Sequence, residues 1–245
     1  MTQYIYEFIG TLMLVLLGDG VCAATSLNLS KAKGAGWVVI ALGWGLAVMM
    51  GVLIAGPVSG AHLNPAVTLG LALAGTFSWN MVAGYVIAQM LGGFVGATLV
   101  WLFYKDHYDA TSGEPDTILG TFCTKPAIRN NWRNFLCETI ATFTLVFVIL
   151  CIGTQGNSFA LGEYKFSTGA LGSWPVTCLI MSIGMSLGGT TGYALNPARD
   201  LSPRLAHALL PIKGKGPSGW SYSWIPVAGP AAGAAIAAGI YLLLA

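Results

Sequence analysis

The chain has 245 residues, of which 55% are hydrophobic and only 8% are Asp, Glu, Lys or Arg, and its formal net charge is +2. A soluble domain carries roughly 25% charged residues, so this chain has too few to cover a surface that faces water. Its mean hydropathy of +0.71 indicates an integral membrane protein with spans of about 20 apolar residues. No cluster of Lys and Arg is dense enough to predict a nucleic-acid partner.

Six long apolar segments follow one another along the chain, together with two shorter ones. The first has no Lys or Arg before it, so we expect a retained span rather than a signal peptide. A helix of about ten residues measures about 15 Å, half of the hydrocarbon thickness. The sequence therefore predicts an all-α membrane protein with six transmembrane helices and two re-entrant half helices. The predicted spans are 4–26, 36–55, 80–104, 133–153, 173–191 and 224–244, the half helices are 64–74 and 196–208, and the loops are 27–35, 105–132, 154–172 and 209–223.

The two halves of the chain resemble each other. Glu7 begins the stretch EFIGTLMLV and Glu138 begins ETIATFTLV, and an Asn-Pro-Ala motif follows each at nearly the same distance. Because each half holds three spans, the second half enters from the opposite side. We predict one transmembrane domain, 1–245, made of inverted repeats at about 1–110 and 130–245, with its site near the midplane. Small residues that let two helices approach closely recur in the third and sixth spans as Gly92-x-x-x-Gly96 and Gly229-x-x-x-Gly233.

An Asn-Pro-Ala motif opens each predicted half helix. Asn is a favoured N-cap because its side-chain oxygen accepts a backbone N–H, and Pro suits the first helical position, where no N–H is needed. Capping leaves the two N–H donors of each Asn free to point into a lumen. Two half helices from opposite faces also aim their positive dipole ends at one place, which repels cations and protons but accepts a neutral hydroxyl. The motifs are Asn64-Pro65-Ala66 and Asn196-Pro197-Ala198.

The segments before the two motifs, 56–63 and 188–195, are too rich in Gly for a helix interior. Non-helical backbone at membrane depth persists only where it faces protein or a water-filled cavity, so their carbonyls are expected to line one wall of a pore. Glu7 and Glu138 lie inside apolar spans, and we interpret them as acceptors for the N–H groups of these segments. The expected carbonyls belong to Gly60, Ala61, His62, Leu63, Gly192, Ala194 and Leu195.

These motifs resemble those of the major intrinsic protein family, and of its aquaglyceroporin branch in particular. The resemblance is strongest in SGAHLNPAVT at 59–68 and GYALNPARD at 192–200, and it extends from about residue 4 to 244. It implies an aquaporin-like homotetramer in the cell membrane, with one pore in each subunit and no cofactor or metal. It also implies passive passage of glycerol, other small uncharged solutes and water, with exclusion of ions and protons.

The resemblance further implies a narrow filter outside the Asn pair, made by Trp44, Gly184, Tyr193 and Arg199. Arg199 would lie about 4.5 Å nearer the outer mouth than Asn196, and we expect it to be unpaired and functional. Water-selective members have a His where this chain has Gly184, so that position is expected to leave space for a carbon chain. Asp200, after the Arg, also fits the glycerol branch.

Three features depart from the family or stay open. Many bacterial glycerol facilitators resemble one another in having Phe where this chain has Tyr193, so the range of solutes stays open. Asp19 has no counterpart in the second half, where Leu150 takes its place; it either lines the outer vestibule or marks the membrane boundary. We expect the His62 side chain to brace its segment rather than to act as an acid or base.

The distribution of charge conflicts with the orientation that the family implies. The family keeps both termini in the cytoplasm, which puts 27–35, 105–132 and 209–223 outside. These loops hold most of the Lys residues, whereas the inner loop 154–172 has only Lys165. The positive-inside rule favours the reverse orientation, but we follow the family because its filter is tied to its topology.

Other functions remain as alternatives. A water-selective channel conflicts with Gly184 and Asp200, and a coupled transporter would need more ionisable groups inside the spans. Passage of undissociated lactic acid is an extension of the leading hypothesis that Tyr193 makes conceivable. We predict no enzymatic activity, because His107, Asp109, Ser112 and the five cysteines show neither a nucleophile-base spacing nor a metal-ligand spacing.

Overall fold

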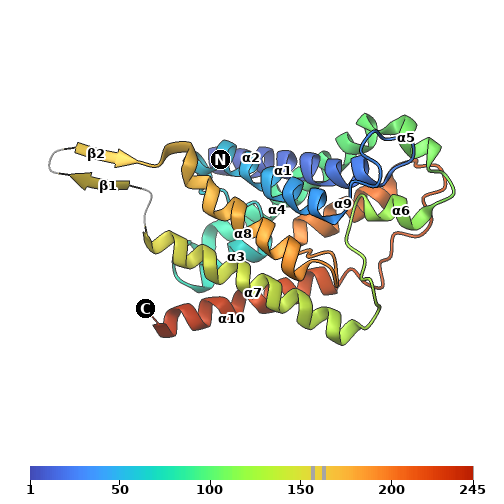
Figure 1. The fold of residues 1–245 in the computed structure, drawn as a ribbon. Coiled ribbons are helices and arrows are strands. Elements are labelled where there is room, and N and C mark those ends of the chain that lie inside the picture. Colours follow the sequence, from blue (N-terminus) through green and yellow to red (C-terminus); the bar gives the residue numbers. More distant parts are fainter. Residues whose placement is uncertain (156–157, 162–163, 245) are drawn as a thin grey trace.

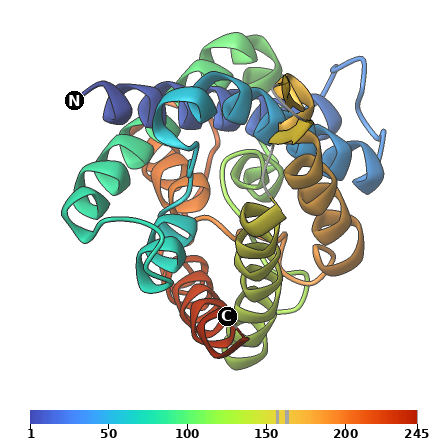
Figure 2. The same ribbon diagram turned by 90° about the vertical axis from the view of Figure 1, so that its left-hand side faces the viewer.

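The computed structural model describes the backbone of residues 1–155, 158–161 and 164–244, and the side chains outside 154–167 and 245. Within these residues, six helices are long and apolar enough to cross a membrane. They run roughly parallel to one another (Figure 1), and Figure 2 shows them from one end. The predicted all-α membrane fold is therefore confirmed. The helices are α1 (Thr2–Ser26), α2 (Trp37–Ser59), α4 (Trp79–Phe103), α7 (Asn131–Gln155), α8 (Trp174–Leu187) and α10 (Ile225–Leu244).

The two predicted half helices are also present. They are α3 (Pro65–Leu73) and α9 (Pro197–Leu209), and each begins at the Pro of an Asn-Pro-Ala motif. α3 packs mainly against α10 and α4, whereas α9 packs mainly against α4. Neither helix is long enough to cross a bilayer alone, so each reaches the interior of the helix bundle and stops there.

The glycine pairs let long helices cross closely in both halves. A Cβ atom at Gly92 of α4 would lie 2.3 Å from the carbonyl oxygen of Phe8 in α1. A Cβ atom at Gly233 of α10 would lie 2.3 Å from the carbonyl oxygen of Thr139 in α7. Any larger side chain would therefore push the two backbones apart, as expected for close helix packing in membranes.

The first segment before an Asn-Pro-Ala motif is shorter than the sequence suggests. We expected non-helical backbone from residue 56, but α2 continues through Pro57 to Ser59. Gly60 then ends the helix with a φ of 82°, and its N–H binds the Gly56 carbonyl at 3.2 Å. A left-handed glycine is a common way to end a helix, and tertiary packing outweighs the low helix propensity of Gly56 and Pro57. In the second half, α8 ends at Leu187, before the predicted residue 191.

Two of the predicted loops contain regular structure. The segment 105–132 includes two short helices, α5 (Lys105–Ala110) and α6 (Pro115–Gly120). The segment 154–172 includes an antiparallel pair of strands, β1 (Ser158–Leu161) and β2 (Tyr164–Ser167), followed by a turn of 3-10 helix, η1 (Gly169–Ser173). These pieces are too short for hydrophobic periodicity to reveal them.

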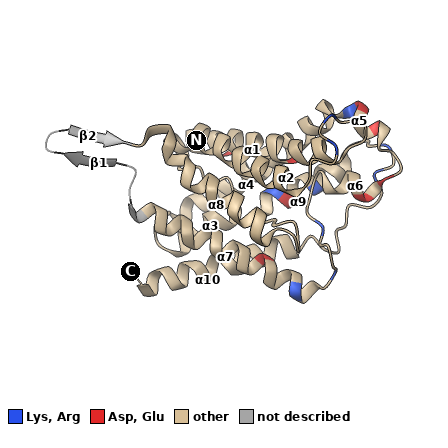
Figure 3. Ribbon diagram, in the orientation of Figure 1, with Lys and Arg blue, Asp and Glu red and all other residues tan. Residues whose placement is uncertain are grey.

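Both chain termini lie at the end of the bundle that carries β1 and β2, opposite α5 and α6 (Figure 1). Lys and Arg gather at the α5 and α6 end (Figure 3). The side chain of Lys165 lies outside the described residues. The outer ends of α1 and α10 thus lie at the same end of the bundle, and the assignment of that end to the cytoplasmic side of a membrane stays a prediction.

Candidate functional site

A cavity of about 160 Å³ lies between the two half helices and the long helices around them. One part of its wall is polar, made by the two Asn residues of the motifs, by Arg199 and by the non-helical segments before the motifs. Another part is apolar and comes from side chains of the surrounding helices. The aliphatic residues are Leu14, Val48, Val52, Leu145, Ile149, Val176 and Ile180 of the long helices, with Val67 and Leu71 of α3.

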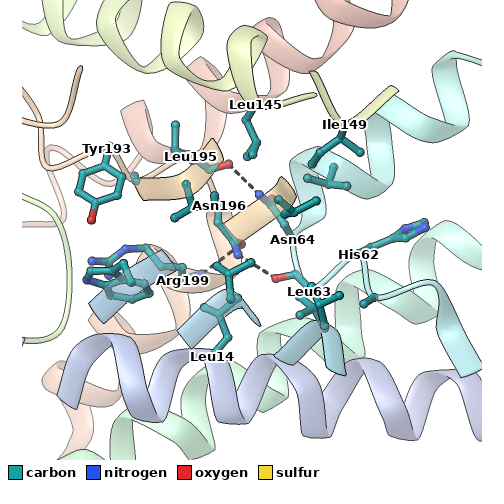
Figure 4. A pocket seen from close by; sticks show the side chains of 18 of the residues that line it. Leu14, His62, Leu63, Asn64, Leu145, Ile149, Tyr193, Leu195, Asn196 and Arg199 are labelled. Atoms are coloured by element: carbon teal, nitrogen blue, oxygen red, sulfur yellow. Dashed lines mark hydrogen bonds between the residues drawn. The ribbon is translucent and has the colours of Figure 1, made fainter. Parts of the chain in front are cut away.

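The two motif Asn residues cap their helices and also contact the opposite half of the chain. Asn64 Oδ1 accepts the N–H of Ala66 at 2.8 Å, and Asn196 Oδ1 accepts that of Ala198 at 2.9 Å. Asn64 Nδ2 donates to the Leu195 carbonyl at 3.0 Å, and Asn196 Nδ2 donates to the Leu63 carbonyl at 2.8 Å (Figure 4).

The capping prediction is therefore confirmed, but the expectation that both amide donors of each Asn are free is wrong. One N–H of each side chain holds the two half helices together. Each amide group has one further N–H donor, and both Asn residues line the cavity. The two helix N-termini consequently meet at a single place in the cavity.

The segments that precede the motifs contain residues in a conformation that L-amino acids rarely adopt. Ala61 and Leu63 have φ values of 51° and 53°, and Tyr193 and Leu195 have values of 40° and 55°. Such residues are strained and persist only where their surroundings hold them. The structure supplies that support through the two buried glutamates.

Each glutamate accepts two consecutive backbone N–H groups, as predicted. Glu7 accepts those of His62 at 2.9 Å and Leu63 at 2.7 Å. Glu138 accepts those of Ala194 and Leu195, both at 3.0 Å. The carboxylates thus hold these N–H groups. The carbonyls of Leu63 and Leu195 accept the opposite Asn side chains, and the lining of a pore by the other carbonyls stays a prediction.

Glu7 has further partners that sequence reasoning missed. Ser59 Oγ donates to it at 2.6 Å, and Gln89 Nε2, from α4, donates to it at 2.8 Å and to Thr68 Oγ1 at 3.0 Å. The sequence did contain a signal for the Gln89 contact: a polar side chain inside an otherwise apolar span needs a buried hydrogen-bond partner. The His62 side chain braces its segment as expected, with Nδ1 3.1 Å from Thr68 Oγ1. Its imidazole points away from the Asn pair (Figure 4).

Three of the four predicted filter residues meet at one end of the cavity. The Arg199 guanidinium carbon lies 3.9 Å from the centre of the Trp44 ring, and Tyr193 also lines this end. The expectation that Arg199 is unpaired is wrong, because its Nη1 lies 3.3 Å from Oδ1 of Asp19 in α1. Asp19 is 1% exposed and is not among the residues that line the cavity, so it does not line this cavity; its place relative to the membrane boundary stays a prediction.

Gly184 has a different role from the one that the sequence suggested. It is not among the residues that line the cavity, and neither is Gly192. A Cβ atom at Gly184 would lie 2.9 Å from Cζ of Tyr193 and 3.0 Å from its hydroxyl oxygen. The space above Gly184 is therefore occupied by the Tyr193 ring and is not open for a solute. Gly184 influences the cavity through the position of that ring.

Asp200 lies outside the cavity lining and organises the loop that follows α6. It accepts the backbone N–H of Thr124 at 2.7 Å and the Thr124 hydroxyl at 2.6 Å. Arg204 donates to Asp200 through Nε at 3.0 Å and Nη2 at 2.7 Å. This loop also brings the Phe122 carbonyl to 3.4 Å from Arg199 Nη1, so Asp200 indirectly supports the position of the Arg199 side chain.

The fold and this cavity define a multi-pass membrane protein whose interior is built by two interrupted helices. The family model for the major intrinsic protein matches residues 1–241, and the chain belongs to that family. Glycerol uptake facilitator protein 3 of Lactiplantibacillus plantarum is 52% identical over 242 residues, which cover 99% of this chain and 96% of that protein.

Two further comparisons agree with this assignment. The glycerol uptake facilitator protein of Streptococcus pneumoniae is 49% identical over 243 residues, covering 99% of both chains. The solved structure of the aquaglyceroporin from Plasmodium falciparum superposes with a TM-score of 0.80 at 32% identity, covering 98% of this chain and 94% of that one. The family and these relatives are channels and facilitators.

Proposed function

We propose that this chain forms a passive channel for glycerol and other small uncharged solutes, that water passes as well, and that no reaction is catalysed. The main support is the arrangement at Asn64 and Asn196, where two capped helix N-termini face one cavity. Each N-terminus carries about half a positive charge. A cation or proton at that place would meet repulsion from both ends, whereas a neutral hydroxyl would meet amide donors and backbone acceptors.

The two kinds of wall in the cavity suit a polyol. Glycerol has hydroxyl groups on one side of a short carbon chain and C–H groups on the other. The donors of Arg199 and the segment carbonyls would bind the hydroxyls, while the apolar wall, with Trp44 and Tyr193 at the narrow end, would contact the C–H groups. A purely polar wall would instead favour water, which has no carbon chain to accommodate.

The remaining assignments belong to the same proposal. The subunits assemble as a homotetramer in the cell membrane with both termini in the cytoplasm, and each subunit is one domain of two inverted repeats. The corresponding interactions of Glu7 and Glu138 support the repeat. The lipid bilayer surrounds the tetramer, and ions do not cross it through the pores.

Flux through purified protein tests the proposed function. Proteoliposomes that contain the protein should equilibrate glycerol faster than empty liposomes, with a rate linear in the gradient and independent of proton or sodium gradients. Stopped-flow light scattering with water, glycerol, urea and lactic acid measures the rates. Glycerol rates equal to those of empty liposomes would reject the proposal, and water flux without glycerol flux would indicate the water-selective alternative.

The variant Gly184→His tests the role of the filter in setting the width of the cavity. The imidazole would have to displace the Tyr193 ring, since a Cβ atom alone comes within 2.9 Å of it. Either the imidazole or the displaced ring would narrow this end of the cavity, so glycerol permeability should fall about tenfold, equivalent to about 1.4 kcal/mol of added barrier, and water permeability should fall less. Stopped-flow rates measure both. Gly189→His is the control, because nothing lies within 4 Å of a Cβ atom there; equal losses of water and glycerol flux in Gly184→His would contradict the assignment.

A further inference from the structure

The ion pair between Asp19 and Arg199 joins two elements that are distant in sequence. Asp19 lies in α1 and Arg199 lies in the first turn of α9, and their closest oxygen and nitrogen atoms are 3.3 Å apart. Both residues are buried, with exposed fractions of 1% and 7%. Arg199 lines the cavity whereas Asp19 does not, so the carboxylate lies behind the guanidinium as seen from the cavity.

The same stretch of α1 also contacts Trp44, a second residue of the proposed filter, which lies in α2. A Cβ atom at Gly18 would lie 2.2 Å from the Trp44 ring, so only glycine lets the indole come this close to α1. One turn after Gly18, Cys22 Sγ accepts the indole N–H at 3.3 Å. The guanidinium of Arg199 then packs on the ring face. Residues 18–22 therefore form a backing layer that fixes both Trp44 and Arg199.

The pairing changes the electrostatics of the filter. A lone guanidinium in a poorly solvated site would present a full positive charge to the cavity, and that field is strong where little water screens it. An ionised Asp19 carboxylate 3.3 Å from Arg199 Nη1 would offset this charge. Among the described residues, Arg199 is the ionic partner of this carboxylate, and Asp19 Oδ2 has no hydrogen-bond partner. The repeat places Leu150 of the second half where the first has Asp19, and Val67 of the first half where the second has Arg199, so these two positions form no such pair.

We propose that Asp19 is a positioning residue of the filter, which holds the Arg199 guanidinium against Trp44 and neutralises it so that polyols pass without being retained. This inference rests on the proposed function as a glycerol channel. Without the carboxylate, the guanidinium is an uncompensated charge that attracts acceptor oxygens more strongly. A polyol carries several hydroxyls and is slowed more than water, which has a single oxygen.

Asp19→Asn tests this role because it keeps the shape of the side chain and removes its charge. The purified variant is reconstituted in liposomes, and its glycerol and water permeabilities are measured by stopped-flow light scattering. The ratio of glycerol to water permeability should fall about tenfold, which corresponds to about 1.4 kcal/mol. An unchanged ratio would overturn the proposal. Should Asp19→Asn not reconstitute, Asp19→Ser removes the same charge and carries the same expectation.

A double-variant comparison separates positioning from general damage to the structure. In an Arg199→Gln background, Asp19→Asn should change the permeability ratio by less than about twofold, because the group through which Asp19 acts is gone. The same loss with and without Arg199 would contradict the proposal. Leu150→Ala is the matched control: it alters packing at the corresponding place in the other half, and its ratio should equal that of the unmodified protein.

The unmodified protein distinguishes the two proposals. If it conducts no glycerol, the proposed function fails. If it conducts glycerol and Asp19→Asn has the same permeability ratio, the function stands and the role of Asp19 fails.

Discussion

Glu7→Ala is expected to destabilise the protein by about 2–6 kcal/mol, because it leaves two buried backbone N–H groups without an acceptor at about 1–3 kcal/mol each. These groups belong to His62 and Leu63, and Glu7 is 0% exposed. Ser59 and Gln89 would lose their carboxylate partner at the same time. In the strained segment from residue 60 to 63, only the N–H groups of Gly60 and Ala61 would then keep an acceptor.

Thermal unfolding in detergent, followed by fluorescence-detected size exclusion, measures this effect. The unfolding midpoint of Glu7→Gln should be intermediate. Its amide keeps one acceptor oxygen, but its NH₂ group would face N–H and O–H groups that also need an acceptor. Ile5→Ala is the control, since it shortens a half-exposed side chain in the same helix and should leave the midpoint close to that of the unmodified protein. A Glu7→Ala protein as stable as the Ile5→Ala protein would show that the carboxylate does not support this segment.

Local chemistry made much of the fold predictable from the sequence. The six apolar segments of membrane-spanning length form six helices. Asn64 and Asn196 cap half helices because Asn followed by Pro is a strong signal for a helix start. Glu7 and Glu138 were recognisable because a carboxylate inside a span needs donors. The nearby non-helical segments 56–63 and 188–195 were expected to offer such donors, because their backbone N–H groups have no partner within a helix.

The features that the sequence did not reveal depend on contacts between distant residues. Asp19 meets Arg199 only once α1 and α9 pack in the same bundle, and no local pattern links them. The Tyr193 ring fills the space above Gly184 because the segment before α9 has an unusual backbone conformation. The amide donors of Asn64 and Asn196 are partly used because each half helix meets the segment that precedes the other.

The helix that continues through Pro57 illustrates a different limit. The low helix propensities of Gly56 and Pro57 predicted that α2 ends near residue 55. The helix instead runs to Ser59, where the hydroxyl binds Glu7 and the carbonyl accepts the Tyr85 hydroxyl at 2.8 Å. These tertiary contacts outweigh a weak local preference. The position of a helix end next to the site could therefore not be predicted from composition alone.

Val52→Trp tests most directly the claim that solutes cross through the cavity between the two half helices. Val52 and Leu53 are neighbours in α2, but Val52 lines the cavity whereas Leu53 lies on the outer face, 36% exposed. An indole at position 52 would fill much of a cavity of about 160 Å³, while one at position 53 would face away from it. Stopped-flow measurements should show glycerol and water rates at the level of empty liposomes for Val52→Trp and unchanged rates for Leu53→Trp. Equal conduction by the two variants would contradict a passage at this place.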